Sequence, residues 1–301
     1  MKKIVYILPI LAGIMFGSVG VFVRTLYGAG FNNATVLFAR TLLAAGLLLV
    51  CILIQNPKLL KLRLQDLPWI LGCGILGMLT TNVCFNISST NLSLAFAAVL
   101  LSIAPVYTLV ISKLVFGNRI TVTKVLCVAM TIAGCILVSG VIGSSSGLSG
   151  SGGLMTLSAV GVIAGIISGI SYGLYSIFSR KGTDSGLNPI TIIFYCMVII
   201  SIVLAPFTDY AVIGNYVAAA PAGHSAFLLL HSLCVGVLPY MLITLSIRRL
   251  TPGTVTILAS CEPGAAMIFG VLCYGEVPTI FSLVGLVITV VALGVLCTAK
   301  E

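Results

Sequence analysis

The sequence predicts an all-α polytopic membrane protein whose ten transmembrane helices form two inverted five-helix repeats. Three observations carry this prediction. The 301 residues are 59% hydrophobic and only 7% charged, which is more apolar surface than a soluble domain can bury. Apolar runs of about 20 residues, the length that crosses a bilayer core, recur along the whole chain. The two halves of the chain also share residues at matching positions.

Short polar breaks separate the apolar runs, and each run is a predicted transmembrane helix. The first begins MKKIVYILPILAGIMFG, whose charged start and apolar body also fit a signal peptide. Because no small-residue cleavage site closes the run, we expect it to remain as the first span. The ten predicted spans are residues 4–27, 33–54, 67–87, 94–116, 121–142, 157–179, 189–208, 225–246, 253–275 and 279–298.

Lys and Arg gather in alternate loops and at the chain ends. Positively charged loops tend to remain cytoplasmic, so this pattern predicts the orientation. The opposite loops, including GSSSGLSGSGGL, contain neither residue, which predicts that both termini are cytoplasmic and that the number of spans is even. The expected location is the cytoplasmic (plasma) membrane. Topology then explains the net charge of +9 without nucleic acid as a partner. The basic residues on the predicted inner side are Lys2, Lys3, Lys58, Lys61, Arg63, Lys113, Arg119, Lys124, Arg180, Lys181, Arg248, Arg249 and Lys300.

The segment KLLKLRLQDLPW (58–69) is predicted to lie along the inner membrane surface, with Trp69 at the headgroup boundary. Membrane lipids are therefore expected partners.

A Gly- and Ser-rich stretch divides the chain into residues 1–143, a linker at 144–153, and residues 154–301, so that each half holds five spans. Because five is odd, the second copy enters the membrane from the opposite side, which gives the inverted repeat found in many secondary transporters. The residues that match at a spacing of 158 are Ser102 and Ser260, Pro105 and Pro263, Leu114 and Leu272, Gly117 and Gly275, and Thr121 and Thr279.

The two five-helix halves, Arg40 in VLFARTLLA and the ninth-span sequence EPGAAMIFGVLCYGE together resemble the drug/metabolite transporter (DMT) superfamily, in its EamA-like branch. The resemblance covers essentially the whole chain. It implies helices around a central cavity, with the fifth and tenth at the periphery, and export of small metabolites from bacterial cells. The family's glutamate at the end of the fourth span is Asn118 here, whereas Glu276 retains it in the ninth. Family substrates range from amino acids to nucleosides and drugs, so the resemblance names none.

Glu262, directly before Pro263, is the most informative residue of the ninth span. Pro263 cannot donate to the carbonyl of Ala259, so this span should bend, and Pro105 should bend the fourth span in the same way. Glu262 then lies near the bilayer midplane, where an ionisable group is costly and indicates contact with substrate, proton or partner. The alternative is a carboxyl, neutral or paired with an arginine, that only ties helices together.

Arg40, in the second span, is the expected partner of Glu262 because its long side chain reaches toward the centre. His231 in the eighth span could titrate near physiological pH, although a buried or interfacial histidine is the safer reading. Asn82 and Asn86 either line an opening or cap loops.

In the sixth span, Tyr172 and Tyr175 either form a cavity wall that stacks on a planar or cationic ligand or pack between helices with bonded hydroxyls. The same span carries a glycine at every fourth position, which lets a neighbouring helix approach closely. These glycines are Gly161, Gly165, Gly169 and Gly173.

Other chemistry is sparse. The 10 cysteines form no CxxC pair, so neither a metal nor a cofactor is expected. There is no Gly-rich phosphate loop of an ATP-driven pump and no HExxH motif, and Glu262 with His231 alone does not make an enzyme. Two functions remain open. One is a secondary active transporter, most simply an exporter, that moves a small polar, zwitterionic or cationic metabolite or drug by alternating access, with proton coupling as a hypothesis. The other is a passive facilitator of the same fold, with Glu262 as a structural helix tie. For either function the sequence leaves open whether the protein is a monomer or a homodimer.

Overall fold

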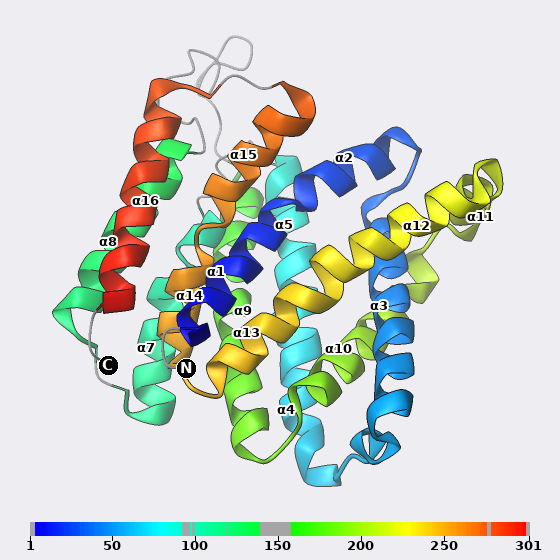
Figure 1. Ribbon diagram of the computed structural model, residues 1–301, viewed down its shortest axis with the longest axis horizontal. Helices are drawn as coiled ribbons and strands as arrows, with labels where there is room; N and C mark the ends of the chain where they lie inside the picture. Colours follow the sequence, from blue (N-terminus) through cyan, green and yellow to red (C-terminus); the bar gives the residue numbers. More distant parts are fainter. Residues whose placement is uncertain are drawn as a thin grey trace.

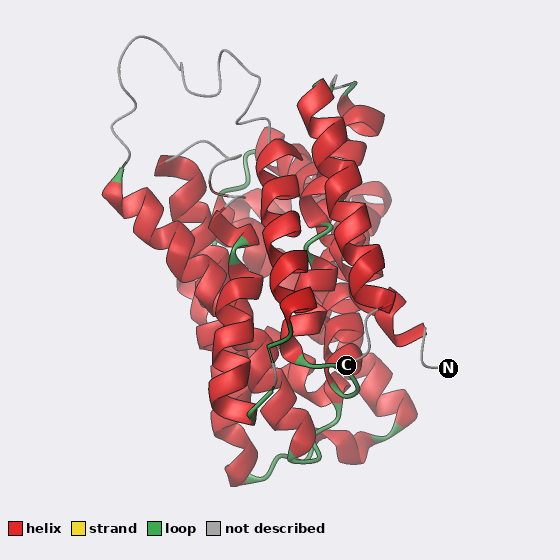
Figure 2. Ribbon diagram, turned by 90° about the vertical axis from the view of Figure 1, so that its left-hand side faces the viewer, coloured by secondary structure: helices red, strands yellow, loops and turns green. Residues whose placement is uncertain are grey.

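A computed structural model of the chain describes residues 4–91, 97, 100–118, 120–138, 158–275 and 278–298. Within these ranges the chain forms helices joined by short loops and contains no strand, and Figures 1 and 2 show the helices gathered in one bundle. Eight of the described helices are long and apolar enough to cross a membrane. Two shorter apolar helices, Leu100–Phe116 and Val122–Val138, stand where the fourth and fifth spans are predicted. The prediction of an all-α polytopic membrane protein is confirmed.

The first half of the chain follows the predicted spans, with interruptions inside several of them. The first span is broken at Ser18, and the third passes through a π-helical segment. Its elements are α1 (Ile4–Gly17), α2 (Val19–Gly28), α3 (Asn33–Gln55), η1 (Pro57–Leu60), η2 (Leu64–Asp66), α4 (Leu67–Leu71), η3 (Gly72–Leu79), α5 (Thr80–Asn91), α7 (Ala104–Phe116) and α8 (Val122–Val138).

The second half adds one helix that the apolar pattern does not predict. This is α11, between the seventh and eighth spans, where the Asp209 side chain accepts hydrogen bonds from the backbone N–H groups of Ala211 and Val212. The elements are α9 (Ala159–Asp184), α10 (Pro189–Leu204), η4 (Ala205–Phe207), α11 (Tyr210–Ala219), α12 (Pro221–His231), η5 (Ser232–Val237), α13 (Leu238–Ile247), α14 (Pro252–Ala259), α15 (Glu262–Tyr274) and α16 (Ile280–Thr298).

Local geometry repeats between the halves. Asn32 and Asn188 cap α3 and α10 by accepting a backbone hydrogen bond in the first turn. Gly117 and Gly275 end α7 and α15 in the left-handed conformation, with φ of 67° and 65°, which glycine adopts without a steric penalty. The π-helical segments η3 and η5 stand in the third and eighth spans. Duplicated sequence is therefore matched by duplicated backbone detail.

Glycines let several helices approach one another closely. Helices α8 and α16 pack side by side at the edge of the bundle (Figure 1), where an added Cβ at Gly285 would come within 2.6 Å of the Gly134 carbonyl oxygen. The predicted stripe on α9 faces α5 and α7, because a Cβ at Gly165 or Gly173 would press against side chains of those helices. The stripe thus holds α9 near the centre of the bundle.

The described basic loops lie at one end of the molecule. The loops after α3, α7, α9 and α13 all reach the lower end in Figure 1. Segments 58–66 and 185–191 meet there with Arg248 around one hollow. The alternating charge pattern is thus a real spatial segregation, while the side of the membrane it faces stays a prediction.

Candidate functional site

The ninth span is interrupted next to Glu262. Helix α14 ends at Ala259, Ser260 and Cys261 form a turn, and α15 starts at Glu262 with Pro263 in its first turn. Proline suits this position because its missing N–H has no intrahelical partner there in any case. The fourth span shows the same arrangement, with a turn at Ile103 and Pro105 in the first turn of α7. The two prolines therefore start half-helices, a sharper interruption than the expected bend.

Nearby side chains meet two backbone carbonyls at this interruption, and the Cys261 thiol also contacts α1. The thiol of Cys135, on α8, lies 3.7 Å from the Ser260 carbonyl oxygen, and the thiol of Cys261 lies 3.3 Å from that of Ile10, on α1. The Ser260 hydroxyl donates to the Thr256 carbonyl at 2.8 Å. Irregular backbone at membrane depth is tolerated where protein meets its polar groups in this way.

The Glu262 carboxyl has no hydrogen bond or ion pair with any described residue. It is half-buried in the first turn of α15, where a helix N-terminus favours negative charge. Tyr172 and Tyr240 lie close enough to interact with it electrostatically. The carboxyl is therefore placed among polar groups without being bonded to them.

Arg40 does not pair with Glu262, contrary to the expectation from the sequence. Its buried guanidinium donates through Nη2 to Oδ1 of Asn82 at 3.1 Å, and its Nε has no partner. Ser232 donates to the Arg40 carbonyl at 2.8 Å, which ties α3 to η5. One guanidinium nitrogen of Arg40 is therefore bonded to the Asn82 amide, and Nε has no hydrogen-bond partner.

Tyr240, which the sequence pattern does not single out, interacts with both the basic and the acidic group of this region. Its ring lies within electrostatic range of both Arg40 and Glu262, and Asn82 is within reach of its hydroxyl. Edge-to-face contacts with Phe16 and Tyr175, at ring-centroid distances of 5.0 and 5.2 Å, hold the ring. The feature of the sequence that points to Tyr240 is its place near the middle of a span, because a buried tyrosine hydroxyl requires a polar neighbour. We call Arg40, Asn82, Tyr172, Tyr240 and Glu262 the polar cluster.

The two tyrosines of α9 have different surroundings. The Tyr172 hydroxyl is buried near Glu262 without a hydrogen-bond partner. Tyr175 is fully buried and its hydroxyl lies 2.8 Å from Oγ1 of Thr244, which also accepts from Ser179 at 3.3 Å. In this structure Tyr175 packs between α9 and α13, which favours the packing reading, while its role in binding stays a prediction.

His231 is fully buried beside the cluster. Its ring stacks on Phe22 at 5.1 Å, neither ring nitrogen has a hydrogen-bond partner, and Arg40 lies within electrostatic range. Asn86 is half-buried one turn beyond Asn82 on α5. Glu276 lies outside the described residues, as does Arg119.

The polar cluster carries groups that can bind a small polar molecule. No group of three metal-ligating side chains occurs among the described residues. Residues 169–173 read GISYG, which matches the G-x-S-x-G nucleophile motif in letters. That motif requires a turn between a strand and a helix, whereas these residues lie inside α9 with Ser171 buried. The cluster instead offers one acid, one base and two phenols from five spans of both halves, which suits recognition of a small polar molecule.

Comparisons with known proteins place the chain in a family. The model of the EamA-like transporter family matches residues 3–140 and again residues 159–298. A transporter of Archaeoglobus fulgidus, uncharacterized by its title, is 27% identical over 92% of this chain and 90% of that protein. The match to a second transporter from that organism spans about half of each protein, 49% of this chain and 48% of the relative.

Two further comparisons bear on function and on fold. A Streptantibioticus cattleyicolor protein described as a probable terminal-alkyne amino-acid exporter is 25% identical over 74% of this chain and 70% of its own length. A solved crystal structure, described only as that of a protein, superimposes on this chain with a TM-score of 0.78 at 14% sequence identity. The match covers 98% of this chain and 96% of the other, which shows a shared fold. The double family match, the helical bundle and these relatives show that the chain is a membrane transporter and belongs to the EamA-like transporter family of the drug/metabolite transporter superfamily.

Proposed function

We propose that the protein is a secondary active exporter that moves a small zwitterionic or cationic metabolite or drug across the cytoplasmic membrane by alternating access. The polar cluster is the substrate site, and Glu262 exchanges a proton during the cycle. Both termini lie in the cytoplasm, and the partners are the substrate and membrane lipids.

One observation carries the proposal: the Glu262 carboxyl has no hydrogen bond or ion pair with a described residue, although it is half-buried at an interrupted helix. A carboxyl that ties helices together needs a bonded partner, because an unpaired polar group inside a protein is costly. An unpartnered acid suits a site that receives a cation or a proton. This argues for the transporter and against the passive facilitator with a structural glutamate.

Arg40 and Glu262, each within electrostatic range of Tyr240, suit the two ends of a zwitterion. The carboxylate of an amino acid would meet the guanidinium, whose Nε lacks a partner, and its ammonium would meet Glu262. A relative named as a probable amino-acid exporter supports this substrate class and the export direction.

The experiment is counterflow in proteoliposomes with a panel of neutral amino acids, amines lacking a carboxylate, and nucleosides. We expect exchange of amino acids or amines. Arg40→Gln should reduce the exchange of amino acids more than the exchange of the matched amines, because only amino acids present a carboxylate to Arg40. Exchange of nucleosides alone, or equal loss for both classes in Arg40→Gln, would contradict the assignment.

A further inference from the structure

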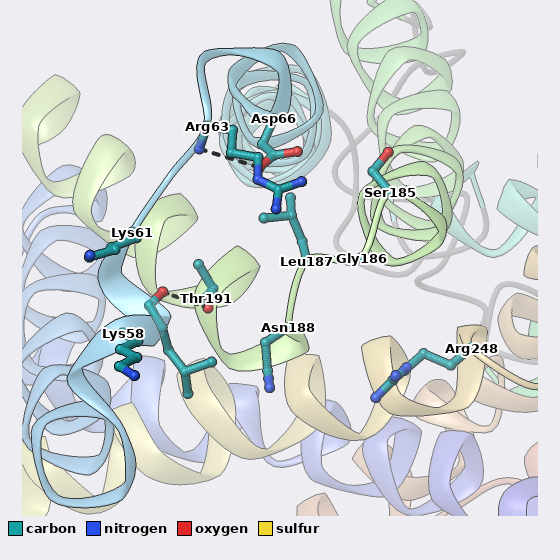
Figure 3. A pocket seen from close by; sticks show the side chains of 11 residues that line it. Lys58, Lys61, Arg63, Asp66, Ser185, Gly186, Leu187, Asn188, Thr191 and Arg248 are labelled. Atoms are coloured by element: carbon teal, nitrogen blue, oxygen red, sulfur yellow. Dashed lines mark hydrogen bonds between the residues drawn. The ribbon is translucent and has the colours of Figure 1, made fainter.

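A basic hollow of about 370 Å³ lies at the end of the bundle where the described basic loops gather (Figure 3). It is lined from three separate parts of the chain: the segment 58–66, the loop before α10 together with its first turn, and Arg248 just after α13. Four charged groups are basic and one is acidic. They are Lys58, Lys61, Arg63, Arg248 and Asp66.

The four cationic groups make no hydrogen bond or ion pair with any described residue. Other basic residues at the same end are bonded: Arg180 lies 2.9 Å from the Asp184 carboxylate and 2.6 Å from the Ile247 carbonyl, and Lys124 bonds Thr251 at 3.3 Å. The tendency of inner loops to be basic explains the sign of these charges. It does not explain why four unpaired cations converge on one concave surface, where their mutual repulsion favours a bound anion.

Hydrogen bonds hold the wall that carries three of these cations. Thr191 donates to the Leu59 carbonyl at 3.0 Å and Tyr195 to the Leu60 carbonyl at 2.7 Å, which fastens the segment 58–66 to α10. A pre-ordered wall lowers the entropic cost of binding.

We propose that the basic hollow binds a phosphate-bearing anion, the headgroup of an anionic phospholipid or a soluble phosphate ester. Arginine forks match the oxygens of a phosphate, and lysines add point charges. The volume exceeds that of a bare ion and falls in the range of about 300–1,000 Å³ typical of small-molecule sites. The hollow shares no residue with the polar cluster, so this inference is independent of the proposed function.

The test uses the purified full chain and two probes at constant ionic strength. Glycerol 1-phosphate probes the soluble source. Detergent micelles containing phosphatidylglycerol, compared with phosphatidylcholine, probe the lipid source. The readout is the thermal shift as a function of probe concentration. The pocket pair is Arg63→Gln with Arg248→Gln. The control pair, Lys113→Gln with Arg249→Gln, removes the same charge from exposed positions outside the hollow.

We expect a saturable shift in the parent and control pair, and binding weaker by about tenfold or more in the pocket pair, because two charge-assisted contacts are lost. A thermal shift with glycerol 1-phosphate would show that a soluble phosphate ester is sufficient for binding. A shift with phosphatidylglycerol alone would identify the lipid headgroup as the ligand. No saturable response to either probe, or equal weakening in both pairs, would overturn the proposal. If the arginine pair does not fold, Lys58→Gln with Lys61→Gln, on exposed side chains, takes its place.

Discussion

Removing the hydroxyl of Tyr172 or of Tyr175 distinguishes a role in binding from a role in packing, because only one of the two hydroxyls is hydrogen-bonded. The Tyr175 hydroxyl is hydrogen-bonded to Thr244 at 2.8 Å, whereas the buried Tyr172 hydroxyl has no partner. Tyr175→Phe removes the bond and keeps the ring. Thr244 retains Ser179 at 3.3 Å, so no buried group is orphaned. We expect the free energy of unfolding to fall by about 1 kcal/mol, the net value of one hydrogen bond.

Tyr172→Phe removes a hydroxyl that is already unsatisfied. The free energy of unfolding should stay constant or rise by up to about 1–3 kcal/mol, the cost of burying an unpaired polar group. If that hydroxyl bonds the substrate, affinity should fall by roughly tenfold, the loss of about 1.4 kcal/mol.

Equilibrium unfolding in one detergent and substrate affinity from counterflow measure both effects on the same preparations. Tyr172→Phe that destabilises as much as Tyr175→Phe, with affinity unchanged, would refute the assignment of Tyr172 to the substrate site. Tyr175→Phe that alters affinity at constant stability would refute its packing role.

Two further predictions address topology and packing. In a cysteine-free background, a single cysteine at Ser146 should label from outside the cell and one at the exposed Ser185 from inside; Ser146 lies outside the described residues. Labelling of both from the same side would contradict the inverted repeat. Gly285→Ala should destabilise by about 1–3 kcal/mol, because its Cβ would lie 2.6 Å from the Gly134 oxygen, whereas Gly294→Ala on the same helix meets nothing within 4 Å and should be neutral or stabilising. Equal effects of the two alanines on thermal stability would show that α8 and α16 are not closely packed.

The spans were predictable from the sequence because lipid permits few structures. Backbone groups in a bilayer must be satisfied internally, so long apolar runs become helices. The duplicated prolines and glycines were also readable, since proline and glycine restrict the backbone locally. Helix α11 was missed because it does not span the membrane and its start depends on the Asp209 cap.

The partners inside the bundle were less predictable. Whether Arg40 meets Glu262 or Asn82 depends on the rotation of α3 about its axis, which long-range contacts set, including the bond from Ser232 to its carbonyl. Tyr240 was missed for the same reason, since periodicity locates a residue along a helix but not the helix that it faces. For Tyr175 the sequence allows both a cavity wall and helix packing, and its contact with Thr244 favours packing.

The central claim is that Glu262 couples a proton to substrate movement, and Glu262→Gln in proteoliposomes tests it most directly. The amide keeps the size of the side chain and cannot exchange a proton at working pH. Uptake is measured with and without an imposed pH gradient, alongside counterflow of the same substrate. The account predicts that the variant loses gradient-driven transport while retaining exchange, because binding and helix movement survive. A variant that responds to the gradient as the parent does would contradict the coupling role and leave Glu262 as a structural residue.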